Sequence, residues 1–431
     1  MKRSAVGYAL AALFFVAYLL VQVVPLLGTR GTGIVALASH ANDYKHIYLG
    51  SRMLADGLSP YNAENMLALA GDYSQRVDPR FRTILPYVYL PFTGFVMRPF
   101  SALPFAKSVA AFQIVNHLCI LGGLIVAAWA AGWRRDGWSL AVLLAAVAFN
   151  TALQRQNNAG QLNAVLFFGM AVLAAGVLRG WHPALVGFIA AFLMLFKLSP
   201  GIFLIWFLLR REWTRAAWMI GWALVLTALT VAVYGLKVHL DFLPVLKDMG
   251  YGRSTWAEYG NTFWRDPYNQ SFNALFHRLF VEYKDSGIVP WAHLSPTAAN
   301  GMTWAVSLAI LAAFAVGSWC KRLDSDAASF AMAVCASLLL PSIMWDHYLV
   351  QALLPAVLLA GVYRDRPGVL AALAAGIVIM SLPVALDQPA FCSGPGLLAM
   401  SFKTIAVLIP FAAALARTIP APRVGTYEAG R

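Results

Sequence analysis

Long apolar runs are the feature that most constrains how this chain can fold. The run from Ala5 to Leu27 is long enough to cross a bilayer as a helix, and further apolar runs recur as far as residue 416. Because 60% of the residues are hydrophobic and only 12% are charged, a soluble protein of this length could not bury the apolar surface. The sequence therefore predicts an all-α polytopic membrane protein.

The basic residues predict how the chain crosses the membrane. They cluster in short loops such as Trp133-Arg134-Arg135 and Tyr363-Arg364-Asp365-Arg366, and Lys and Arg accumulate on the cytoplasmic side. All the basic clusters can lie on the cytoplasmic side only if one of the apolar runs does not cross the membrane. We expect this run to be 85–103, which prolines interrupt. The result is about 12 spans, with both termini cytoplasmic and the first run kept as a signal-anchor rather than a cleaved signal peptide.

Two long polar segments are then expected on the extracytoplasmic side of the cell (inner) membrane. Residues 28–83 form the first outer loop, with helical stretches predicted at the interface, and residues 237–296 form the second. Residues 417–431 form a cytoplasmic tail. We expect one domain over residues 1–431, because no soluble domain separates from the apolar runs.

The net charge of +13 is explained by this topology. A nucleic-acid partner is not expected, because the basic residues form no continuous face, whereas an anionic lipid or lipid-phosphate ligand fits. The four cysteines are scattered without the spacing of a zinc site or a disulfide framework. We expect no cofactor and no metal.

Asp43 is the first candidate for chemistry, in the first outer loop. Tyr44, Ile47 and Tyr48 follow it at helical spacing. A carboxylate in a partly desolvated place can have a raised pKa and act as a general base. The alternative is that Asp43 only caps the helix that follows it.

Three polar turns between apolar runs are expected on the same side. The amides of Gln154–Asn163 suit sugar hydroxyls, although any turn between spans is polar. Lys197 lies deep in apolar sequence, where a lysine either snorkels to the interface or meets an anion. Asp346 and His347 are adjacent, and such a pair ligates a metal, orients a substrate, shuttles protons or forms a structural hydrogen bond, although two ligands alone do not make a metal site.

The second outer loop ends in the polar sequence Asp266-Pro267-Tyr268-Asn269-Gln270-Ser271-Phe272-Asn273. Within it, Asn269-Gln270-Ser271 matches a glycosylation sequon, a pattern that is common by chance. Arg253 and Arg265 could hold a phosphate bidentately, with scattered surface arginines as the alternative. Together the polar clusters indicate a site at the outer membrane boundary that joins a lipid-borne and a water-borne reactant.

These motifs resemble glycosyltransferase family 87, which holds polyprenyl-phosphate-mannose-dependent mannosyltransferases and related arabinofuranosyltransferases. They run in the family's order from residue 43 to residue 348. Two departures are Leu85-Pro86-Tyr87, where Tyr-Pro-Pro is usual, and the polar pair Lys45-His46 after the aspartate. The matching pieces are Asp43-Tyr44 with Tyr48, Leu54-Ala55-Asp56-Gly57 to Pro60-Tyr61, Gly160-Gln161-Leu162-Asn163, Lys197-Leu198-Ser199-Pro200, Asn269-Gln270-Ser271-Phe272-Asn273 and Trp345-Asp346-His347-Tyr348.

The resemblance implies a GT-C-type transmembrane helix bundle with an extracytoplasmic active site. It implies an inverting transfer of a hexose, mannose before arabinofuranose, from a polyprenyl-phosphate donor to a lipid-linked or glycan acceptor. Asp43 would be the catalytic base, His347 would join it, and Lys197 and Arg265 would neutralise the phosphate. The residues expected to bind the donor sugar or phosphate are Gln161, Asn163, Asn269, Gln270, Asn273, Asp346, Tyr44 and Tyr48.

Two other classes of function stay open. A lipid or solute transporter is the first, although no internal repeat is evident and the polar residues gather at one boundary. The second is a non-catalytic partner in the assembly of envelope enzymes.

Overall fold

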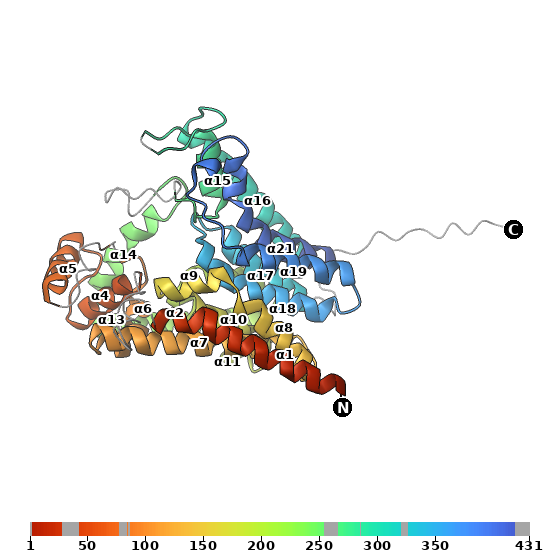
Figure 1. The fold of residues 1–431 in the computed structure, drawn as a ribbon. Coiled ribbons are helices and arrows are strands. Elements are labelled where there is room, and N and C mark those ends of the chain that lie inside the picture. Colours follow the sequence, from red (N-terminus) through yellow and green to blue (C-terminus); the bar gives the residue numbers. More distant parts are fainter. Residues whose placement is uncertain are drawn as a thin grey trace.

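The fold is known from a computed structural model, in which the chain forms a bundle of helices (Figure 1). The model describes residues 2–27, 43–76, 84, 87–253, 266–284, 286–319 and 326–418. Within these ranges the extended pairing consists of an isolated bridge between Asn269 and Trp345. The predicted all-α class is confirmed for the part of the chain that the model describes.

Four described helices are long and apolar enough to cross a membrane. They are the N-terminal span Ser4–Leu26, α7 (Phe105–Ala130), α13 (Trp213–Tyr234) and α16 (Pro296–Trp319). A fifth results if α8 (Gly137–Ala148) and α9 (Thr151–Ala159), which meet at 60°, count as one bent span. The chain is thus a membrane protein of several helical spans, and the number of about 12 remains a prediction.

The other elements are shorter. The N-terminal span is built from α1 (Lys2–Tyr18), the π-helix η1 (Leu19–Val23) and α2 (Val24–Leu27). The remaining elements are α4 (Tyr44–Ala55), α5 (Ala63–Arg76), α6 (Pro91–Ser101), α10 (Asn163–Leu178), α11 (Pro183–Phe196), η3 (Ser199–Gly201), α12 (Ile202–Leu209), α14 (Leu236–Asp248), α15 (Phe272–Phe280), α17 (Asp326–Leu339), η5 (Asp346–Ala352), α18 (Leu353–Val362), α19 (Pro367–Ser381), η6 (Pro389–Phe391), α20 (Gly396–Met400), η7 (Phe402–Thr404) and α21 (Ile405–Thr418).

Small residues let the helices approach closely. At the crossing of α1 and α8, a Cβ on Gly7 would lie 2.8 Å from the backbone nitrogen of Trp138, and one on Gly137 would lie 2.4 Å from that of Tyr8. Close backbone contact of this kind is how helices associate in a bilayer, where lipid competes with apolar side chains. Large aromatic side chains such as Trp206 and Phe330 fill the core of the bundle.

Residues 43–76, part of the predicted first outer loop, contribute two helices to one end of the molecule. Figure 1 shows α4 and α5 at the side opposite to the start of α1 and the end of α21. The helices predicted in this loop are present within residues 43–76. However, α4 lies in the core rather than at an exposed interface, because Ile47, Leu49 and Met53 are fully buried. Nine of its twelve residues are buried, and they include the polar Lys45 and Ser51.

Two expectations on the chain path can be compared with the elements. The run 85–103 contains α6, whose 11 residues reach about 16 Å and fall short of the roughly 30 Å hydrocarbon core. The prediction of a turn over Gln154–Asn163 is wrong for its first half, because α9 continues to Ala159. The asparagine Asn150 caps α9, since its side chain accepts a hydrogen bond from Leu153 N, and this local bond outweighs the polar composition.

Candidate active site

Asp43 directly precedes α4 and faces the end of α9. Its backbone N–H donates to Ala159 O at 2.9 Å, and Gln161 Nε2 donates to its carboxylate oxygen Oδ2 at 2.8 Å. The carboxylate makes no capping bond to α4. Burial raises the pKa of Asp43, opposed by the Gln161 hydrogen bond and by the charges of Lys45 and Arg155. Asp43 is thus not merely a helix cap.

Gly160 places Gln161 against Asp43. It ends α9 in the left-handed conformation at φ 69°, which glycine adopts without steric cost. The chain then reverses, and the side-chain amide of Gln156 donates to the carbonyl oxygen of Gln161. The Gly-Gln-Leu-Asn motif therefore forms a tight corner with its amides turned inward.

A chain of hydrogen bonds leads from this corner to Lys197. Asn163 Nδ2 donates to Gln156 Oε1 at 2.8 Å. The other end of the Asn163 amide, Oδ1, accepts from both Lys197 Nζ and Gln351 Nε2 at 3.0 Å each. The structure thus brings Asp43, Gln161, Asn163 and Lys197 into one polar network, although more than 150 residues separate the ends in sequence.

Lys197 lies in the break between α11 and η3 and turns into the bundle. Its Nζ lies 3.5 Å from the centre of the Tyr348 ring, within cation–π distance. Burial lowers the pKa of the Lys197 ammonium to about 7. Lys197 therefore does not snorkel outward.

A cavity of about 310 Å³ opens beside Lys197. Its polar lining includes Lys197, Tyr348, Gln351 and Tyr89, and the Tyr89 hydroxyl donates to Gln161 Oε1 at 3.0 Å. The lining residue Leu246 is 44% exposed, so the cavity extends to the outer surface of the bundle there. The apolar lining comes from α14, α17 and the segments beside α6 and η3, and includes Leu90, Leu198, Leu246, Met249, Leu338 and Ile343. The cavity is amphipathic, because its lining combines the Lys197 cation and a few polar groups with mostly apolar side chains.

Two basic residues that the sequence analysis did not assign to the site surround Asp346. Arg155 Nε lies 3.0 Å from Asp346 Oδ1, and Lys403 Nζ lies 3.7 Å from Oδ2. Asp346 is fully buried, and the Arg155 guanidinium carbon lies 3.4 Å above the Tyr268 ring. The sequence held a signal for Lys403, because a lysine inside an apolar run is costly unless it meets a partner.

Removal of the Asp346 carboxylate should destabilise the protein strongly. Asp346→Ala would leave Lys403, 3% exposed at its side chain, without its counter-charge, and we expect a loss of about 3–5 kcal/mol in the free energy of unfolding. The exposed pair of Asp72 with Arg76 is the control, and Asp72→Ala should cost at most about 1 kcal/mol. Thermal unfolding in detergent measures both. Equal small shifts would contradict the buried ion-pair cluster.

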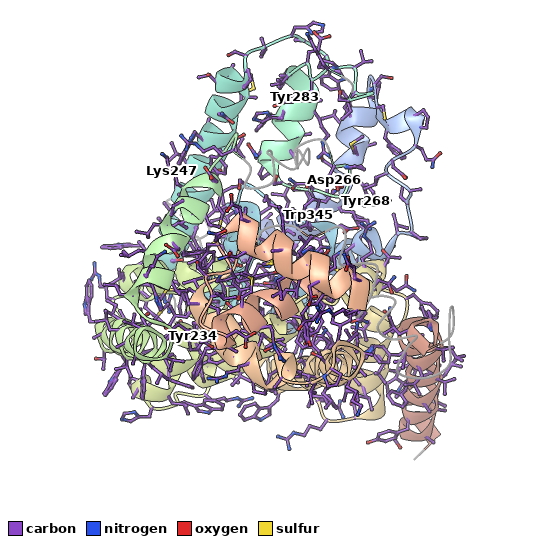
Figure 2. All side chains as sticks on the ribbon, turned by 90° about the vertical axis from the view of Figure 1, so that its left-hand side faces the viewer. Tyr234, Lys247, Asp266, Tyr268, Tyr283 and Trp345 are labelled. Atoms are coloured by element: carbon purple, nitrogen blue, oxygen red, sulfur yellow. The ribbon has the colours of Figure 1, made fainter. Side chains whose placement is uncertain are left out.

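Residues 266–273 are held near the start of η5 by their own side-chain amides. Figure 2 shows Asp266, Tyr268 and Trp345 close together on this side of the molecule. Asn269 Oδ1 accepts from Met344 N at 3.1 Å, and Gln270 Nε2 donates to Met400 O at 2.9 Å. These side chains bond backbone atoms, as does Asn273, whose Nδ2 donates to Ser342 O at 3.3 Å.

The sequon Asn269-Gln270-Ser271 is inaccessible in the folded protein, because Asn269 is fully buried. Arg278, on α15, is buried too and donates to Asn269 O at 2.8 Å and to Ser401 Oγ at 2.7 Å. Arg253 lies 4.0 Å from Asp248. Arg265, the predicted second phosphate ligand, lies outside the described residues.

Three further predicted site residues have contacts of a different kind. The Tyr44 hydroxyl lies 2.8 Å from Ser108 Oγ, and the Tyr48 hydroxyl donates to Leu103 O at 2.9 Å. Both rings thus pack toward α7 and away from the Lys197 cavity. His347 stands between Trp345 and Tyr348, and its Nε2 is buried without a hydrogen-bond partner among the described residues.

Comparison with known proteins gives one match. The model of glycosyltransferase family 87 matches residues 87–345, a range that includes Gln161, Asn163 and Lys197. Asp43 precedes this range, and His347 follows it by two residues. No curated protein and no solved structure matches the chain. Among the described residues, no three His, Cys, Asp or Glu side chains are grouped so that they could hold a metal ion.

Proposed function

Since the chain belongs to glycosyltransferase family 87, we propose that it transfers a hexose, mannose in the first place, from a polyprenyl-phosphate donor to a lipid-linked or glycan acceptor. The transfer takes place at the extracytoplasmic face of the cell membrane. The observation that carries the proposal is the amphipathic cavity beside Lys197, which is joined to Asp43 through Tyr89 and Gln161.

The charged phosphate and the apolar isoprenoid tail of the donor each match one part of the cavity lining. The phosphate lies against Lys197, whose depressed pKa of about 7 reflects burial without a full counter-charge. An arriving phosphate supplies that charge and keeps the ammonium protonated. The isoprenoid tail follows Met249 and Leu338 and leaves toward lipid past the exposed Leu246.

Asp43 supplies the base. It accepts the proton of the acceptor hydroxyl while that oxygen forms a bond to the anomeric carbon. The bond from that carbon to the phosphate oxygen breaks, and its electron pair leaves with the phosphate, whose charge Lys197 offsets. A phosphate is a good leaving group and needs no general acid. Attack opposite to the phosphate inverts the anomeric carbon through an oxocarbenium-like transition state.

The other predicted residues divide by their contacts. Gln161 orients Asp43, Asn163 orients Lys197, and the unpartnered Nε2 of His347 is available to the sugar or its phosphate. We assign Asn269 and Gln270 to holding the loop that carries Asp266 and Tyr268. The residues assigned to the framework rather than to the donor are Asn273, Asp346, Tyr44 and Tyr48.

Purified protein in detergent tests the function. Mannosyl- and arabinofuranosyl-phosphoryl-prenols are supplied separately, with and without an acceptor glycan, and free prenyl phosphate is measured. We expect acceptor-dependent release from the mannosyl donor and little from the arabinofuranosyl donor. The reverse preference would show that the donor sugar is arabinofuranose rather than mannose. The absence of release from both, together with gradient-dependent uptake into proteoliposomes, would favour the transporter instead.

The pH dependence of donor use should be bell-shaped. The acid limb reports Asp43, whose ionised form is the base and whose pKa burial raises, so activity grows as pH rises through that pKa. The alkaline limb reports Lys197, whose charged form is lost as pH rises through about 7. Measurement of kcat/KM for the donor against pH checks both. Lys197→Arg should abolish the alkaline limb, because arginine stays protonated; an unchanged limb would contradict this assignment.

A further inference from the structure

A second cavity lies at the end of the bundle away from Asp43. It has a volume of about 480 Å³ and lies between α8, α18 and α19. The helix α8 runs from this groove to α9, and α9 carries Arg155 near Asp346. The groove and the donor cavity share no lining residue, so they are separate. Its apolar floor includes Val142, Ala146, Val357, Ala360, Leu373 and Ile377.

One end of this groove is basic and aromatic. Arg134 and Arg364 line it together with Trp133 and Trp138. The Arg134 side chain is 87% exposed and contacts Asp136 through Nε at 3.3 Å. Arg364 Nη2 donates to the carbonyl oxygen of Ala131 at 2.9 Å. A guanidinium has five N–H groups, so these contacts do not use all the donors of either arginine.

The charges around this end do not cancel. The two short loops that border it hold the arginines Arg134, Arg135, Arg364 and Arg366 against the acids Asp136 and Asp365, which leaves two positive charges. Trp133 is fixed in place, since its Nε1 donates to Val357 O at 3.1 Å. Indoles at the level of lipid head groups and basic pockets between membrane helices are both typical of lipid recognition.

We propose that this groove binds an anionic glycerophospholipid, with its phosphate at Arg134 and Arg364 and one acyl chain along the floor. The net positive charge favours an anion, and the apolar lining favours an acyl chain, which a soluble phosphate lacks. The donor is not needed for this binding, so the inference stands apart from the transferase activity.

Native mass spectrometry of the full chain in detergent tests the site with two lipids of the same acyl chains, phosphatidylglycerol and phosphatidylcholine. We expect phosphatidylglycerol to bind preferentially, and Arg134→Gln with Arg364→Gln to weaken it about 30-fold, or about fivefold for each arginine. The matched control is Arg179→Gln with Arg211→Gln, which removes two exposed arginines that pack on Trp129 and Trp319 outside the groove.

Three results would overturn the proposal. They are equal binding of the two lipids by the native chain, an equal loss in the control variant, and displacement of the lipid by millimolar glycerol 3-phosphate, which would indicate an anion site without a lipid groove. Because Arg364 also bonds backbone carbonyls at the end of α7, the double variant can fail to fold. Arg134→Gln alone leaves those bonds in place and should still weaken phosphatidylglycerol binding about fivefold.

Discussion

Asp43→Asn should lower kcat for sugar transfer by about 10²–10⁴-fold while the protein still folds in the membrane. Asparagine has the size of aspartate, and its amide oxygen can accept the Gln161 hydrogen bond that holds the native side chain at 2.8 Å. It cannot take the proton of the acceptor hydroxyl. The release of prenyl phosphate by purified variant and native protein, at saturating donor and acceptor, measures the effect.

A matched control variant is available at the opposite end of α4. Asp56 follows the other end of α4, and its exposed carboxylate pairs with Arg52 at 3.6 Å. Asp56→Asn should leave the transfer rate unchanged. Near-normal transfer by the Asp43 variant would show that Asp43 is not the base. Loss of transfer with envelope complexes intact would argue against a purely structural partner in assembly.

Lys197→Met should lower kcat/KM for the donor by about 10–100-fold, and change the KM of the acceptor little. Methionine keeps the length and the apolar stem of lysine but lacks the charge, and a hydrogen bond to a charged group contributes about 1.5–3 kcal/mol. Steady-state kinetics with each substrate varied in turn separate the two effects.

The control for this charge is Lys237, an exposed lysine that pairs with Asp241 at 3.0 Å at the start of α14. Lys237→Met should leave both kinetic parameters unchanged. If Lys197→Met reduced donor and acceptor use equally, the phosphate role would be untenable, and Lys197 would instead support the network through Asn163.

The convergence of the polar motifs was predictable because polar groups are costly in apolar surroundings. Lys197 and the Gly160–Asn163 corner each interrupt apolar sequence, and such side chains are kept only where they meet a partner or a ligand. That reasoning anticipated the network from Gln161 to Lys197. It could not anticipate that Asn150 would cap α9 and turn the first half of a predicted turn into helix.

The direction of side chains within each motif was beyond the sequence. Asn269 and Gln270 look like sugar ligands by type, yet their amides bond backbone atoms of segments distant in sequence. Tyr44 likewise follows Asp43 directly but points to Ser108. Arg155 gains its place only when α9 and η5 pack together around Asp346. These outcomes depend on long-range packing, which residue type and spacing do not encode.

Equilibrium binding of a mannosyl-phosphoryl-prenol to the purified protein tests the central claim, that Lys197 and its cavity hold the donor while Asp43 acts on the acceptor. Native protein, Asp43→Asn and Lys197→Met are compared without acceptor. We predict that the Asp43 variant binds the donor as the native protein does, and that the Lys197 variant binds at least about tenfold more weakly. Unchanged binding by the Lys197 variant, or loss of binding by the Asp43 variant, would contradict the claim.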